Sequence, residues 1–69
     1  MATGDSTPVR LERLTEVESR AGLKSSEIYK QIKTGEFPRP VKVTGKAVRW
    51  VSTEVDAWIR QRIEAREAA

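Results

Sequence analysis

The sequence predicts a small α+β domain, mostly α, and three observations carry this prediction. Two short segments with apolar residues at helical spacing are separated by Gly22. Pro38 and Pro40 then end the helical pattern, and apolar and basic residues alternate around a glycine-containing loop over 41–50. A third apolar stripe at helical spacing runs over 52–63. Helix, turn, helix, hairpin and helix in this order predict a winged helix-turn-helix, with the hairpin as the wing.

Length and composition bound what the chain does. Its 69 residues allow one domain with a small core. It has no His and no Cys, which excludes disulfides, zinc fingers and His-based acid–base catalysis, so we expect no cofactor, no metal and no enzyme. No apolar run approaches the roughly 18 residues of a membrane helix, and the first residues do not form a signal peptide. We expect a cytoplasmic protein without a membrane partner.

Domain boundaries follow from the same patterns. The polar N-terminus predicts a disordered lead over 1–9, and the patterned segments predict a folded domain over 10–64. Residues 65–69 are expected to form a frayed C-terminal tail.

The first helix is expected over 16–21. Thr15 followed by Glu18 reads as a capping box, in which each side chain accepts the other residue's backbone amide. Leu11 is expected to cover the core from just outside the helix. Gly22 is placed to end it in the left-handed conformation.

The second helix follows the glycine turn directly. Ser25 or Ser26 is expected to cap it, and Ile28 and Ile32 form its buried stripe. Gly35 ends this helix by the same left-handed geometry.

The hairpin is expected to close with a four-residue loop over 44–47. This register places Val43 opposite Val48, turns the valines towards the core, and sets Lys42 directly opposite Arg49. Like charges opposite one another destabilise a two-stranded ribbon, so the pair indicates a polyanion that neutralises it.

The last helix is expected to begin at Ser52 as its N-cap. Val55, Trp58, Ile59 and Ile63 then form one apolar stripe that packs on the hairpin.

The charge distribution points to a ligand. Residues 24–50 hold seven Lys and Arg against two Glu, a net +5, although the whole chain carries only +3. A basic segment of this kind is typical of a surface that meets DNA, and an ordinary solvated face explains the charge alone equally well. With Ile28 and Ile32 inward, the opposite face of the second helix is basic and hydroxylated, as a recognition helix in a major groove requires. The candidate DNA-binding residues are Ser25, Ser26, Tyr29, Lys30 and Lys33 on this helix, and Arg39, Lys42, Lys46 and Arg49 on the wing and its approach.

The chain resembles the AlpA family of phage and prophage regulators over residues 11–63. The resemblance rests on five runs of sequence. These are Arg13-Leu14-Thr15-Glu16-Val17, Gly22-Leu23-Lys24-Ser25-Ser26-Glu27-Ile28-Tyr29, Gly35-Glu36-Phe37-Pro38-Arg39-Pro40-Val41-Lys42-Val43, Val48-Arg49-Trp50 and Glu54-Val55-Asp56-Ala57-Trp58-Ile59. It implies a MerR-like, excisionase-like winged helix-turn-helix whose second helix enters the major groove and whose wing enters the minor groove.

The resemblance also implies a function. Such proteins bind double-stranded DNA near attachment sites or integrase promoters. They act as recombination directionality factors (excisionases) that favour excision by a tyrosine integrase, as transcriptional regulators of an integrase, or as both. The excisionase resemblance implies cooperative head-to-tail assembly on DNA, and the lack of an oligomer seam predicts a monomer in solution. The alternative is a protein-interaction adaptor whose basic face binds an acidic partner such as an integrase.

Overall fold

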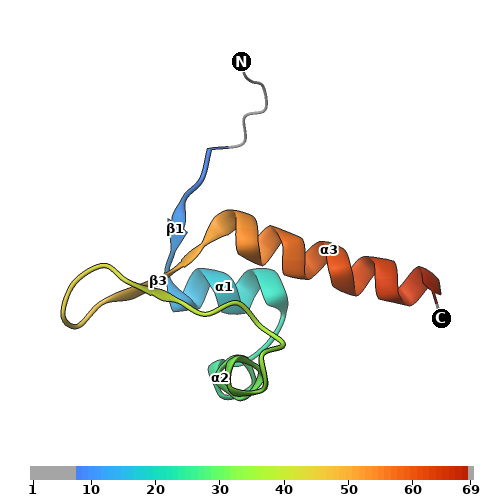
Figure 1. Cartoon of the computed structure of the whole chain (residues 1–69), viewed down its shortest axis with the longest axis horizontal. Coiled ribbons are helices and arrows are strands. Elements are labelled where there is room, and N and C mark those ends of the chain that lie inside the picture. The colour runs from blue at the N-terminus through green and yellow to red at the C-terminus, as the bar shows by residue number, and fades with distance from the viewer. Residues whose placement is uncertain (1–7, 69) are drawn as a thin grey trace.

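The computed structural model describes residues 8–68, so most of the lead expected over 1–9 lies outside the described residues. The elements are β1 (Leu11–Glu12), α1 (Leu14–Ala21), α2 (Ser25–Thr34), β2 (Val41–Lys42), β3 (Val48–Val51) and α3 (Ser52–Ala68). In Figure 1 the hairpin projects to one side of the molecule, α3 extends to the other, and α2 lies at the end opposite β1. The predicted fold class, a winged helix-turn-helix, is confirmed.

The sheet has one strand more than the sequence predicted. Its strands are antiparallel in the order β1-β3-β2, with Leu11 opposite Val51 and Glu12 opposite Trp50. Because side chains alternate along a strand, this register turns Glu12 inward, where it is 4% exposed. The prediction that Leu11 covers the core is therefore wrong, since Leu11 lies on the outer face and is 51% exposed.

One core joins all three helices to β3. Its members are buried side chains: Val17, Ile28, Phe37, Trp50, Val55 and Trp58. Ile32 and Ile59 pack against this core, as predicted. The prediction that Ile63 continues the packed stripe of the last helix is wrong. Helix α3 extends past α1 at this point, and the Ile63 side chain is 48% exposed (Figure 1).

The helix C-termini are as predicted and the N-termini are not. Gly22 and Gly35 end α1 and α2 with φ of 71° and 80°, which favour glycine. The capping box at Thr15 is wrong: Arg13 holds the N-cap position of α1, and its amide donates to Glu16 Oε1 at 2.8 Å. The helix begins earlier because β1 ends at Glu12 and leaves only one residue between strand and helix.

Neither serine caps α2. The N-cap is Lys24, with extended backbone and no side-chain hydrogen bond, and its carbonyl accepts the Ile28 amide at 3.0 Å. Ser25 is already the first helical residue. Both serines therefore lie inside helix α2, after the N-cap position that Lys24 occupies.

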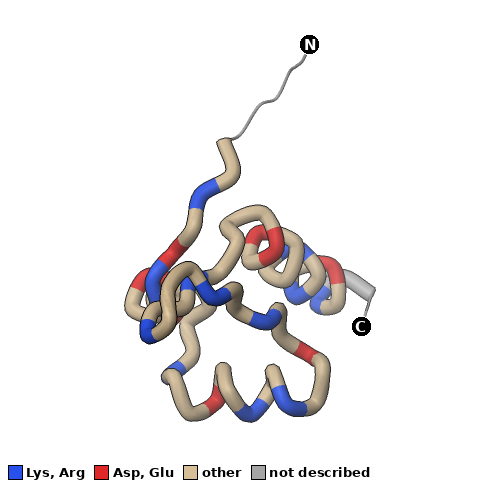
Figure 2. The backbone as a smooth tube through the Cα atoms, turned by 60° about the vertical axis from the view of Figure 1, so that its left-hand side comes forward, with Lys and Arg blue, Asp and Glu red and all other residues tan. Residues whose placement is uncertain are grey.

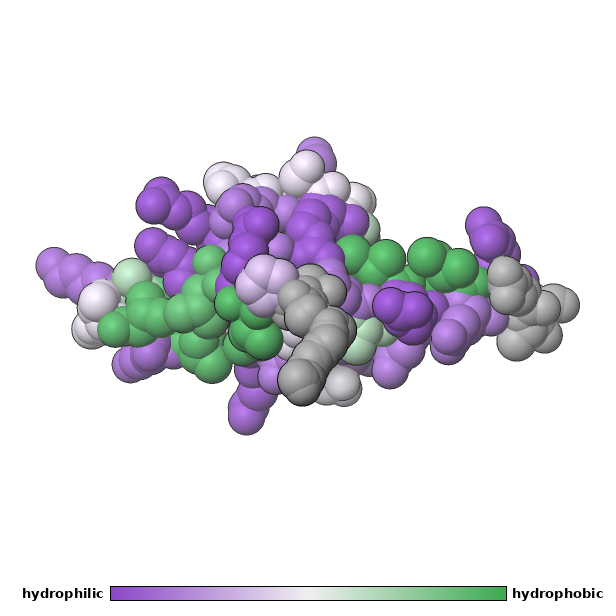
Figure 3. Space-filling view, turned by 90° about the horizontal axis from the view of Figure 1, so that it is seen from above, coloured by the Kyte–Doolittle hydropathy of each residue, from purple (hydrophilic) through white to green (hydrophobic). Residues whose placement is uncertain are grey.

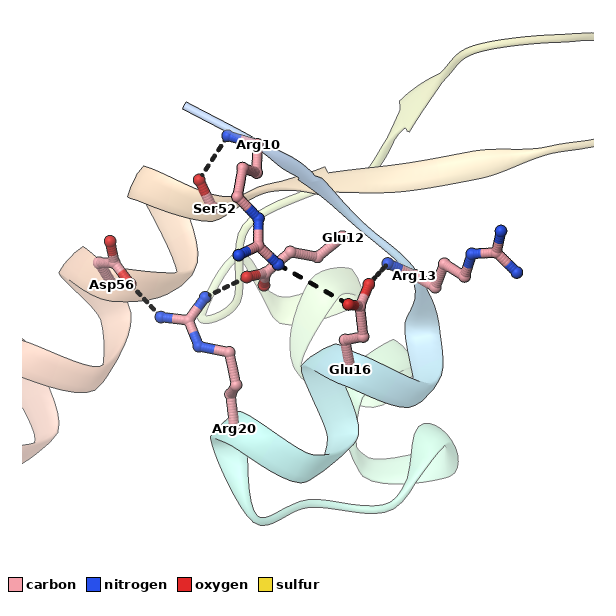
Figure 4. A network of polar contacts seen from close by, with 7 residues as sticks. All are labelled: Arg10, Glu12, Arg13, Glu16, Arg20, Ser52 and Asp56. Carbon is pink, nitrogen blue, oxygen red and sulfur yellow. Dashed lines mark hydrogen bonds and ion pairs between the residues drawn. The ribbon is translucent and has the colours of Figure 1, made fainter. Parts of the chain in front are cut away.

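Ser52 serves β1 rather than capping α3. Its hydroxyl accepts the Arg10 amide at 2.8 Å, and its own amide donates to the Arg10 carbonyl at 2.8 Å. These two hydrogen bonds fasten the N-terminal strand to the junction of β3 and α3 (Figure 4).

A charged network joins β1, α1 and α3. Arg20 Nη1 donates to the buried Glu12 at 2.6 Å, and Arg20 Nη2 donates to Asp56 (Figure 4). Partial burial opposes the charge of Arg20, but hydrogen bonds and Coulombic attraction from both carboxylates outweigh it and raise the Arg20 pKa. Arg20 of α1 therefore links β1 to α3, two elements that lie far apart in the sequence.

Candidate nucleic-acid interface

The outer face of α2 presents basic and hydroxyl side chains to solvent. Ser26, Lys30 and Lys33 are exposed, and Tyr29 is 44% exposed. Ile28 on the other side of the helix is fully buried. Figure 2 shows the basic positions of α2 at the end of the molecule away from the N-terminus. Ser25 is half-buried at the start of the helix.

Trp50 holds α2, the proline segment and the hairpin together. Its ring meets Tyr29 of α2 edge to face, with centroids 6.1 Å apart, and its indole nitrogen donates to the Pro38 carbonyl at 3.0 Å. Since the indole is fully buried on β3, the face of the sheet that carries Trp50 is turned towards α2.

The register of the hairpin differs by one residue from the prediction. Val41 lies opposite Arg49 and Lys42 opposite Val48. The Val43 amide donates to the Ala47 carbonyl at 2.9 Å, and Thr44 Oγ1 accepts the Ala47 amide at 3.1 Å. The Thr44 side chain thus closes the loop in a register that the alternation did not predict. Relative to β3, the one-residue slip turns the side chains of β2 to the other face of the sheet.

Because of this slip, Lys42 and Arg49 do not oppose each other. Lys42 shares the face of Val48 and Trp50, whereas Arg49 lies on the other face, so the two cations are not cross-strand neighbours. Val41 and Val43 are 39% and 42% exposed, and the prediction that they face the core is wrong.

The prediction that Lys42 lies on the outer side of the hairpin is wrong, because the observed register turns it to the face of Val48 and Trp50. Lys42 is exposed on the face that is turned towards α2, and Lys46 is exposed in the hairpin loop. Arg39 is exposed in the segment between α2 and β2. The structure therefore places three basic side chains on the wing and its approach, and separates Arg49 from them.

The sequence did not predict two features that shape this site, a hydrogen bond of Trp50 and the strand β1. The Trp50 bond to the Pro38 carbonyl depends on a backbone acceptor, and the two-residue strand β1 is too short for a period-2 pattern. Within residues 8–68 no cluster of acidic side chains is arranged to hold a metal ion. No helix in the described part of the chain is long and apolar enough to cross a membrane.

A basic helix beside a β-hairpin, closed by a C-terminal helix, defines a winged helix-turn-helix protein. The family described as "Prophage CP4-57 regulatory protein (AlpA)" matches residues 10–63, and the chain belongs to this family. It is also 43% identical over 67 residues to "Uncharacterized protein ORF88" of Enterobacteria phage P4, a match that covers 97% of this chain and 76% of that protein. No solved structure matches the chain.

Proposed function

We propose that this protein is a sequence-specific double-stranded DNA-binding regulator of a phage or mobile element. The observation that carries the proposal is the outer face of α2, where Lys30 and Lys33 are exposed while Ile28 anchors the opposite side in the core. Membership in a phage regulatory family supports the same function.

Each interface residue has a role that follows from its place. Helix α2 enters the major groove, where Lys30 and Lys33 donate to guanine or to phosphate. Hydroxyls of Ser26 and Tyr29 donate to phosphate or to base edges. Ser25 is half-buried at the start of α2, and we assign it a contact with phosphate.

The wing supplies sequence-independent affinity. Arg39, Lys42 and Lys46 contact phosphates beside the groove that α2 occupies, and each contact releases counterions and steepens the salt dependence. Arg49 is left out of this interface, because its side of the hairpin is turned away from α2.

The finer role we propose is that of a recombination directionality factor, an activator of integrase transcription, or both. Both roles need the same DNA-binding surface, so the surface does not separate them. Footprinting on DNA that flanks the gene, including any integrase attachment site, tests the common step. Protection confined to one or a few short sites is expected, and uniform or absent protection contradicts sequence-specific binding.

A second experiment separates the two roles. Excision by the neighbouring tyrosine integrase is measured with and without the protein on DNA that carries both attachment sites, and integrase mRNA is measured in parallel. Stimulated excision at constant integrase concentration identifies a directionality factor. A change in transcript alone identifies a transcriptional regulator.

A further inference from the structure

The outer face of the sheet is apolar, and no element of the described residues 8–68 packs on it. The observed register places on one face the side chains of Leu11, Val41, Val43, Arg49 and Val51. Leu11, Val41 and Val43 are between 39% and 51% exposed. Figure 3, seen from the side opposite α2, shows apolar side chains gathered over the half of the molecule that holds the hairpin.

Arg49 lies within this face without a counter-ion. Its side chain is half-buried, and the hydrogen bond it makes is from Nη1 to the Val48 carbonyl at 2.8 Å. None of the carboxylates in the described residues pairs with it, whereas Arg20 has two such partners. A half-buried guanidinium among valines is stabilised by a carboxylate, which it binds with two parallel hydrogen bonds.

We infer that this face docks a partner protein through a segment that carries aliphatic side chains around one Asp or Glu, with Arg49 as the anchor. The aliphatic residues fit Leu11, Val41 and Val43, and the carboxylate fits the unpaired guanidinium. The cores of protein interfaces are depleted of most charged residues but enriched in arginine, so an apolar face around a single arginine fits such a core.

The position of the face favours a protein over DNA. Trp50 and Lys42 lie on the face turned towards α2, and Arg49 and its valines lie on the reverse side. A partner bound there leaves α2 open to DNA. The side chains of the face are too few for the roughly 800 Å² per partner of a stable complex, so the docked segment is short and its binding is weak.

The test starts from a random library of 12-residue peptides selected on the full chain. Peptides that combine aliphatic residues with a carboxylate are expected to be enriched. Their synthetic forms are titrated into the isotopically labelled protein, free and bound to its footprinted DNA. Methyl shifts are expected at Leu11, Val41, Val43 and Val51 in both states. Enrichment of no such peptide, or shifts confined to another surface, overturns the inference.

Two variants change the chemistry of this face while keeping the shape of the side chain, so that the domain is expected to fold as the parent does. Arg49→Met keeps the aliphatic stem and removes the charge, and it is expected to weaken peptide binding by about tenfold or more while DNA affinity stays unchanged. Val43→Thr keeps the shape and adds a hydroxyl, and it is expected to weaken peptide binding in the same direction. Lys30→Ala is the control, because it is expected to lower DNA affinity and leave peptide binding unchanged.

The outcomes of the two proposals are distinguishable. If Arg49→Met lowers DNA affinity and DNA itself shifts the methyls of this face, the surface belongs to the DNA interface and the inference fails. If the chain binds no specific DNA but binds the selected peptides through Arg49, the inference stands and the proposed function fails.

Discussion

At the scale of the residue, Arg20 shows how a small domain holds its parts with one charged side chain. It bridges the buried Glu12 of β1 and Asp56 of α3, and the second oxygen of Glu12 has no partner among the described residues. Since the Arg20 pKa is raised above an already high ordinary value, the arginine stays charged in the folded and unfolded states at every pH below about 12. Titration of Arg20 itself therefore removes no stability in that range, and does so only as the pH rises above the folded-state pKa.

Arg20→Met is expected to destabilise the domain by about 1–3 kcal/mol, because it leaves both oxygens of the buried Glu12 without a donor. Urea unfolding measures the free energy, with Arg60→Met on α3 as the matched control. Equal stability of the two variants would show that the network does not hold β1. A second variant, Arg20→Met with Glu12→Leu, is expected to recover most of the stability, since no buried carboxylate is then left unpaired.

Trp50→Phe separates positioning from packing at the same scale. Phenylalanine keeps an aromatic ring beside Tyr29 but removes the hydrogen bond to the Pro38 carbonyl. We expect a decrease of DNA affinity in addition to the decrease of stability, measured by fluorescence anisotropy at a temperature where both proteins are fully folded. An unchanged affinity for the specific site would mean that Trp50 contributes to packing alone.

At the scale of the element, the order of the helices and the C-terminal ends of α1 and α2 were predictable, whereas the helix N-termini and the strands were predictable only in part. Glycine is the residue most favoured at a left-handed helix end, and Ile28 fits a single apolar stripe, so Gly22, Gly35 and Ile28 can each be predicted from sequence. The hairpin register is set by the Thr44 side chain and the length of the loop, which the alternation of residues does not specify. Strand β1 has two residues, too few for any pattern, and its presence moves the start of α1 to Leu14.

The register makes a prediction about coupling within the wing. Because Lys42 and Arg49 lie on opposite faces, a double-mutant cycle of Lys42→Thr and Arg49→Thr is expected to give a coupling free energy within about 0.5 kcal/mol of zero. Chemical unfolding of the four proteins measures it. A clear repulsive coupling would restore the register with the two cations opposite each other.

Lys42→Thr is also expected to act on DNA binding. It should lower affinity and reduce the slope of log K against log salt by about one unit, because one phosphate is no longer neutralised. Arg49→Thr is expected to leave this slope unchanged, since Arg49 is turned away from α2. Equal changes of slope in the two variants would contradict the separation of the two faces.

At the scale of the whole molecule, stability depends on one core shared by all three helices and β3. Ile28→Ala is expected to cost about 2–5 kcal/mol, because its side chain is fully buried in that core. Ile63→Ala is the matched control on α3, where the side chain is half exposed, and it is expected to cost less than about 1 kcal/mol. Thermal unfolding followed by circular dichroism compares them, and similar destabilisation would show that α3 packs more closely along its length.

The candidate site was predictable where helical geometry alone decides it. Because Ile28 is buried, the period of the helix places Lys30 and Lys33 on the opposite, exposed face. One buried position on α2 is therefore enough to predict which of its residues face solvent. Grouping of the wing cations depends on strand register, and the alternation pattern grouped Arg49 with Lys42, whereas the two lie on opposite faces. Long-range contacts such as the one between Tyr29 and Trp50 require the assembled core.

The measurement that tests the central claim most directly is the affinity of a double variant, Lys30→Ala with Lys33→Ala, for the footprinted site and for unrelated DNA of equal length. The matched control is Arg60→Ala, which removes an exposed cation of α3. We expect the double variant to keep the fold and to bind the specific site about tenfold or more weakly, with a smaller effect on unrelated DNA, because base contacts carry about 1–3 kcal/mol each. We expect Arg60→Ala to bind as the parent does. Equal affinities of parent and double variant for the specific site would contradict the claim that α2 reads the DNA.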